Sequence, residues 1–311
     1  MSLYPYSIKN YNPNDFEEFV EFCKEINSFG QEENDLTSSI LEKKLRRPHY
    51  SPSQDLFLAK LNKKIVGFLN MTPELRIGRI ILSGFVHPGH RRLGLAKEML
   101  GCVLKRASDV KAKVVHVCLS EGNIAAKVLV RKLEFTPVRC FLKLEINLSE
   151  VIKETTSLLS VEIGQFKPGE ETQLTSIQNK CFTGTWGFCP NTVEEIRYYL
   201  DLTESRLKDV ISTRSRKDKS IIGYCWTIMI GKNLKDFSKK KGRIHMFGID
   251  PDYRGKGLGK ILLLSGLHYL RKKGAGVVEL IVDKENAVAN YLYSSLGFKT
   301  MSSSFWYEKK L

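Results

Sequence analysis

The sequence predicts a mixed α/β protein built from two copies of one domain. Its length of 311 residues fits two domains of roughly 150 residues each. Strand-like and helix-like segments follow one another in the same order in both halves. A shift of 163 positions also aligns the halves without a gap for more than forty residues. The matched pairs are Arg91 with Arg254, Gly94 with Gly257, Ala96 with Gly259, Asn123 with Asn286, and Phe135 with Phe298.

The second repeat opens with a predicted strand at residues 161–166, and a helix follows that runs through Cys181. Residues 191–202 predict another helix, with Asn191 or Thr192 as its N-cap. The elements that follow are hairpin strands 209–215, 220–231 and 243–249, a helix at 260–274, a buried strand at 277–282, a helix at 286–297 and a last strand at 304–311.

The first repeat shows the same order. Its predicted elements are a strand at 6–9, a helix at 15–26, strands at 56–61, 65–71 and 79–86, a loop and a helix, a strand at 114–119, a helix, and a strand at 139–146. The polar segment 148–160 reads as a surface linker. We therefore predict domains at residues 1–150 and 158–311.

Composition limits the setting in which the chain works. The longest apolar runs fall well short of the roughly 20 residues that span a bilayer, and the N-terminus lacks a signal-peptide pattern. The seven cysteines form no CxxC pair, so reduced thiols and no metal are expected. These features predict a cytoplasmic protein without a membrane partner.

The net charge of +15 and the pI of about 9.4 suit nucleic acid, an acidic partner or an anionic cofactor. Much of the excess is local, at residues 213–220 and 231–243. The sequence has no helix-turn-helix, zinc-finger or RNP signature. Nucleic acid is therefore not the expected partner.

A glycine-rich loop, "IDPDYRGKGLGKILL" at residues 249–263, joins a predicted strand to a predicted helix. Its glycines are Gly255, Gly257 and Gly259. Backbone N–H groups at a helix N-terminus attract anions, and glycine lets a phosphate approach them closely. The basic residues around this point are Arg254, Lys256 and Lys260. The spacing fits neither a P-loop nor a GxGxxG dinucleotide turn.

Two motifs in the second repeat resemble those of the GCN5-related N-acetyltransferases. The cofactor motif [Q/R]xxGx[G/A] corresponds to residues 254–259, after a strand that ends in Ile249-Asp250-Pro251. The second motif, NxxAxxLYxxxGF, corresponds to Asn286, Ala289, Leu292, Tyr293, Gly297 and Phe298. The resemblance covers nearly the whole chain, twice. The tandem layout and residues 181–188 are similar to mycothiol-synthase-like tandem acetyltransferases.

The resemblance implies that each domain is a mostly antiparallel, twisted sheet flanked by helices. A V-shaped splay is expected between the fourth and fifth strands. It also implies acetyl-CoA as cosubstrate. Its pantetheine arm would meet the backbone of Phe247, Gly248 and Ile249. Asn286 would begin a helix beside that arm. The amides expected to hold the pyrophosphate are those of Arg254, Gly255, Lys256, Gly257, Gly259 and Lys260.

The family match implies that Tyr293 is the general acid for the departing thiol. Many relatives carry a Glu base where this chain has Arg243. His245, two positions further along, is our candidate base, acting directly or through water. Glu279, or a water chain to a backbone carbonyl, is the other option.

The first repeat departs from the motifs. Val130 stands where Tyr293 stands, and Glu134 replaces the family glycine. We therefore expect this repeat to be non-catalytic. Phosphate contacts in it are still implied by the loop residues Arg91, Arg92, Gly94 and Ala96.

The predicted function is transfer of acetyl from acetyl-CoA to a primary amine, catalysed in the second repeat. A small-molecule acceptor is favoured over a protein or peptide. The candidate lining residues of its site are Phe182, Trp186, Phe188, Cys189 and Tyr198. Use of a longer acyl-CoA, or a CoA-binding interaction module without catalysis, is the alternative. The expected state is a monomer whose domains form a pseudo-dimer.

Overall fold

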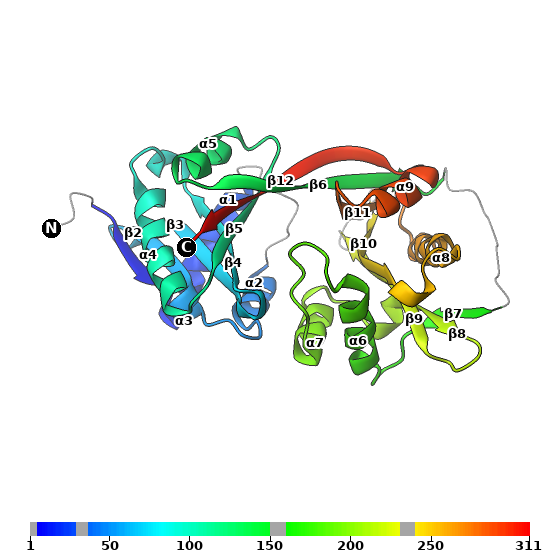
Figure 1. Cartoon of the computed structure of the whole chain (residues 1–311). Helices are drawn as coiled ribbons and strands as arrows, with labels where there is room; N and C mark the ends of the chain where they lie inside the picture. The colour runs from blue at the N-terminus through cyan, green and yellow to red at the C-terminus, as the bar shows by residue number, and fades with distance from the viewer. Residues whose placement is uncertain (1–4, 29–36, 150–159, 231–239) are drawn as a thin grey trace. The chain divides into compact units, whose positions relative to one another are not determined.

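The structure is a computed structural model that describes residues 5–28, 37–149, 160–230 and 240–311 (Figure 1). The chain divides into two compact units. Unit 1 comprises residues 1–138 and 306–311, and unit 2 comprises residues 139–305. Residues 150–159 of the predicted linker and residues 231–239 of the basic segment lie outside the described residues.

Unit 1 is a sheet with the strand order β1-β2-β3-β4-β5, followed by the end of β12. The strands are β1 (Ser7–Asn10), β2 (Leu56–Leu61), β3 (Lys64–Glu74), β4 (Arg79–Val86), β5 (Val114–Ser120) and β12 (Lys299–Lys310). The helices are α1 (Phe16–Ser28), α2 (Ser38–Leu45), α3 (Pro52–Asp55), α4 (Leu95–Asp109) and α5 (Ile124–Lys132).

Unit 2 has the strand order β6-β11-β10-β9-β8-β7. The strands are β6 (Thr136–Asn147), β7 (Val161–Gln165), β8 (Val210–Ser215), β9 (Ile221–Ile230), β10 (Lys241–Ile249) and β11 (Val277–Asp283). The helices are α6 (Glu171–Phe182), α7 (Val193–Leu202), α8 (Leu258–Lys272) and α9 (Ala287–Ser295).

The predicted mixed α/β class and the predicted order of elements are confirmed. Among the described strand pairings, β4 with β5 and β10 with β11 are parallel, and the other registers are antiparallel. Helix α7 begins at the expected cap, because Thr192 Oγ1 accepts from the Glu195 N–H and the Glu195 carboxylate accepts from the Thr192 N–H. The sequence interpretation did not include the short helices α2 and α3.

Each unit completes its sheet with a strand from the other repeat. In unit 2, β6 pairs antiparallel with β11, with Phe141 opposite Asp283 and Asn147 opposite Val277. In unit 1, the end of β12 lies by β5, where Glu308 Oε2 is 2.9 Å from His116 Nε2. The periodicity of the sequence shows where these strands are but not which sheet they join.

Two apolar clusters cover opposite faces of the unit 2 sheet. Side chains of α8 and α9 pack on one face, around Ile244, Val278 and Leu280. Side chains of α6 and α7 pack on the other, around Tyr224 and Trp226. This second face is called the α6/α7 face below.

Candidate active site

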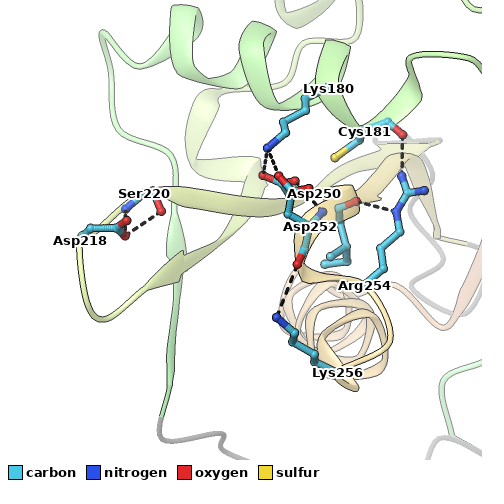
Figure 2. A network of polar contacts seen from close by, with 9 residues as sticks. Lys180, Cys181, Asp218, Ser220, Asp250, Asp252, Arg254 and Lys256 are labelled. Carbon is cyan, nitrogen blue, oxygen red and sulfur yellow. Dashed lines mark hydrogen bonds and ion pairs between the residues drawn. The ribbon is translucent and has the colours of Figure 1, made fainter.

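The loop between β10 and α8 is held in place by α6 (Figure 2). Asp250, only 5% exposed, accepts from the backbone N–H of Asp252 at 3.1 Å and so begins the short 3₁₀ helix Pro251–Tyr253. Lys180 of α6 places its Nζ 2.8 Å from Oδ2 of both carboxylates. Hydrogen bonds to Asp250 and Asp252 raise the pKa of Lys180 above its ordinary value, so the ammonium stays charged.

Arg254 fastens the same loop from its other side (Figure 2). Its Nε donates to the carbonyl oxygen of Ile249 at 3.0 Å, and its Nη2 donates to the carbonyl oxygen of Cys181 at 2.8 Å. The guanidinium therefore binds the ends of β10 and α6 together. Contact between the Arg254 backbone amide and a ligand stays a prediction.

The glycine loop leaves open space beside the start of α8. Gly255 and Gly257 both have a φ of +76°, a region that favours glycine. Apart from each glycine and its two chain neighbours, no described atom lies within 4 Å of where a Cβ would stand. Gly257 is the N-cap of α8, and no described side chain caps its first amides. Lys256 and Lys260 are exposed beside them. This open, cationic helix end fits a phosphate-bearing group such as the pyrophosphate of CoA.

The corresponding loop of unit 1 keeps the same conformation. Arg91 Nε donates to the carbonyl oxygen of Val86 at 2.9 Å, and Gly94, with a φ of +82°, is the N-cap of α4. Arg92 has a φ of +63° at the position that is glycine in the second repeat. A non-glycine residue there costs on the order of 1 kcal/mol. The strained loop is retained, and Ala96 lies in the first turn of α4, but phosphate binding by unit 1 stays a prediction.

Unit 1 lacks a phenol at the position of Tyr293. Val130 is buried there, at 9% exposure. Glu134, with a φ of +66°, replaces a glycine and places Oε2 2.7 Å from Lys309 Nζ. The absence of catalysis in this repeat stays a prediction that these side chains support.

Strands β10 and β11 part at a β-bulge. Their parallel pairing ends at Ile244 with Leu280, although β10 runs on to residue 249 and β11 to residue 283. The register of β10 against β9 shifts between Ile244 and Met246, so His245 is the extra residue. Its ring makes an edge contact with Trp226 at 5.1 Å, on the α6/α7 face. His245 thus lies where the split between the strands begins.

The predicted pantetheine strand forms one side of this split. Phe247, Gly248 and Ile249 pair with residues 223–225 of β9 on one edge. On their other edge, the described register with β11 has already ended. Alternate backbone N–H and C=O groups of this segment therefore face the split, which matches the predicted role without testing it.

Tyr293 lies beside the split on α9. It is 6% exposed, and its ring contacts Phe247 at 6.4 Å and Phe298 at 5.6 Å. Asn286 starts this helix by accepting from the Ala289 N–H at 3.1 Å. Burial raises the pKa of Tyr293 well above its ordinary value, so the phenol keeps its proton at neutral pH. This is the protonation state that a general acid requires.

The two candidate bases are both weak. Burial, aided by the charge of Arg243, lowers the pKa of His245 to about 4, so the imidazole is neutral. Burial opposes ionisation of Glu279, yet the hydrogen bond from Lys143 and the charge of Arg243 lower its pKa overall. The unprotonated ring nitrogen of the neutral His245 imidazole can accept a proton, whereas the Glu279 carboxylate already binds two cations.

Four of the expected lining residues, Phe182, Trp186, Phe188 and Cys189, lie at the end of α6 or in the α6–α7 connection, whereas Tyr198 lies within α7 and contacts Tyr199. Phe182 and Phe188 lie 5.5 Å apart, and Trp186 lies 6.1 Å from Phe141 of β6. Arg139 of β6 stacks on Trp186, with Cζ 5.8 Å from the ring centroid. The sequence interpretation missed Arg139 and Phe141 because the strand that carries them belongs to the first repeat.

No group of three metal-ligating side chains occurs in the described part of the chain. In the same residues, no helix is long and apolar enough to cross a membrane.

Together, an uncapped helix start with lysines beside it, a split between the parallel strands β10 and β11, and a buried phenol next to that split are the features expected of an acyltransferase site. The sequence profile of the acetyltransferase (GNAT) family matches residues 16–135 and 172–298, one match in each repeat. The chain belongs to this family, and it is an N-acetyltransferase.

The chain is also similar to individual proteins that carry names. The mycothiol acetyltransferase of Stackebrandtia nassauensis is 26% identical over 266 residues, which cover 84% of each chain. That of Thermomonospora curvata is 30% identical over 231 residues, covering 72% of this chain and 71% of the relative. A GCN5-related N-acetyltransferase from Sphaerobacter thermophilus, 19% identical, superposes with a TM-score of 0.71 over 98% of this chain and 96% of that one. Because the sequence identity to the Sphaerobacter protein is low, this similarity shows the fold alone.

Proposed function

We propose that this chain transfers the acetyl group of acetyl-CoA to the primary amine of a small molecule, and that unit 2 carries out the reaction. The observation that carries the proposal is the buried phenol of Tyr293 beside the split. The glycine loop lies at the end of the same split. Val130 occupies the corresponding place in unit 1, so the first repeat lacks this acid.

Bound acetyl-CoA supplies an activated acetyl thioester. The amides from Arg254 to Lys260 would hold its pyrophosphate, and the free edge of Phe247–Ile249 would hold its pantetheine arm. As the amide bond forms and the carbon–sulfur bond breaks, Tyr293 gives its proton to the departing sulfur. His245 takes a proton from the amine, directly or through water.

The relatives named mycothiol acetyltransferase support a small-molecule amine as the acceptor class. This chain has Arg243 at the position where many relatives carry a Glu base. Its guanidinium is bound to Glu279, with Nε 2.6 Å from Oε1. The proposed acceptor is therefore a small-molecule amine, and its identity is not taken from the names of these relatives.

Tyr293→Phe tests the proposal, because it removes only the hydroxyl. Free CoA thiol released from acetyl-CoA in the presence of an amine panel reports turnover. We expect kcat to fall about 10² to 10⁴-fold, the usual contribution of general acid–base catalysis, with little change in the Kd for CoA. Tyr291→Phe is the matched control, since Tyr291 is 77% exposed two positions earlier on the same helix. Equal turnover in both variants contradicts the assignment.

A further inference from the structure

Part of the α6/α7 face of unit 2 is uncovered. Helices α6 and α7 pack over β9 and β10, but Ile281 in β11 is 60% exposed although β11 lies between β10 and β6. Glu279 and Asp283 point to the same face as Ile281, because side chains alternate along a strand. Lys143 of β6 lies directly opposite Ile281 in the register. The exposed side chain of Ile281 therefore forms an apolar surface in the middle of the sheet, and this surface is called the floor below.

This floor is continuous with the proposed reaction site. His245 and Trp226 lie on the same face at the start of the split. Beyond that point β11 runs from residue 280, where pairing with β10 ends, to residue 283. Ile281 therefore lies on the part of β11 that borders the split.

An aromatic wall stands at the other end of the floor. Phe141 lies opposite Asp283 in the register and contacts Trp186, with ring centroids 6.1 Å apart. Arg139 Nε is 2.9 Å from Asp283 Oδ2, and its other end binds the carboxylate of Glu285. Because Arg139 also stacks on Trp186, it fixes the α6–α7 connection against β6.

The charges near the floor pair with one another. Glu279 is bound by Arg243 and Lys143, with Lys143 Nζ 2.9 Å from its Oε2. The Arg139 guanidinium is bound by two carboxylates. These pairs favour an acceptor recognised by apolar contact rather than by an added charge.

We infer, on the basis of the proposed function, that the acceptor amine carries an apolar group of aromatic size. That group lies over Ile281 and against the Phe141–Trp186 pair. Strand β6, which the first repeat contributes to the sheet of unit 2, is thus a specificity element of the active site. The first repeat, which lacks the phenol, thus supplies a strand that helps to select the acceptor for the second repeat, which has the phenol.

Two primary amines of different apolar size, phenethylamine and ethylamine, test this inference in the full chain with acetyl-CoA. We expect kcat/KM for phenethylamine to exceed that for ethylamine at least about tenfold, since one methylene in an apolar pocket already gives about tenfold discrimination. Ile281→Ala and Phe141→Ala should each reduce this ratio about tenfold. Ile163→Ala is the matched control. Ile163 is a 37% exposed isoleucine on β7, at the other end of the strand order of unit 2.

A binding measurement separates this inference from the proposed function. Calorimetric titration of phenethylamine into the CoA-loaded protein should show binding that Ile281→Ala weakens and Ile163→Ala does not. Such binding without acetyl transfer to either amine overturns the proposed function and supports the specificity element. An equal ratio of kcat/KM for wild type and both test variants overturns the inference, as does the absence of phenethylamine binding.

Discussion

Gly248→Ala should push helix α6 away from β10. A Cβ at Gly248 would stand 2.7 Å from Cys181 Cβ, 3.0 Å from Cys181 Sγ and 3.3 Å from Tyr224 Cε1. The shortest of these contacts is to a Cβ, which cannot rotate away as the end of a flexible side chain can. Strand and helix must therefore separate by several tenths of an ångström. The Cys181 carbonyl, which accepts from Arg254, moves with the helix.

Overpacking of this kind costs about 1–3 kcal/mol. A domain the size of unit 2 loses about 2–4 °C in Tm for each kcal/mol. The hydrogen bond from Arg254 to Cys181 also weakens, and a charged hydrogen bond of this kind contributes about 1.5–3 kcal/mol. We therefore expect the affinity for CoA to fall about tenfold, because this bond helps to hold the glycine loop.

Thermal melts and CoA titration of Gly248→Ala measure both effects. Gly164→Ala is the matched control, because a Cβ there meets only Ser212 Oγ, at an ordinary 3.7 Å. Adding Cys181→Gly to Gly248→Ala should recover part of the lost stability, and a double-mutant cycle isolates that coupling. If Gly248→Ala matches the control in both Tm and CoA affinity, the reasoning from this contact is wrong.

Two further outcomes follow from buried charge in unit 2. Since the folded pKa of His245 is about 4 and its ordinary value is 6.5, the unfolded chain binds a proton between these pH values that the folded chain does not, and stability falls as the pH drops through this window. Urea melts measure the free energy of unfolding at pH 7 and at pH 4.5. Between these pH values His245→Gln should lose about 2 kcal/mol less of this free energy than the wild type loses. Equal losses in the two proteins would count against a buried neutral imidazole. Glu279 is 1% exposed whereas Arg243 and Lys143 are 38% and 31% exposed. Glu279→Gln should therefore cost about 1–2 kcal/mol, but the double change Arg243→Met with Lys143→Met about 3–5 kcal/mol, because only the latter leaves a buried charge without a partner. Equal costs in urea melts contradict this asymmetry.

The sequence by itself determined the features that depend on neighbouring residues. Thr192, one of the two N-caps that the pattern predicts, caps α7, because its partner Glu195 lies within one turn. The positive φ values at Gly255 and Gly257 follow from a strand that turns directly into a helix. The repeat offset, the element order and the position of Tyr293 on α9 are likewise readable along the chain.

Only the tertiary structure decided which distant residues meet. Lys180 and Asp250 are 70 positions apart, and Cys181 and Arg254 are 73 apart, yet these pairs hold the loop. The bulge at His245 depends on the register with β9. The pairing of β6 with β11 brings Phe141 to Trp186. Local periodicity carries no information on these contacts, because strand pairing and helix packing are chosen by the burial of surfaces far apart in the chain.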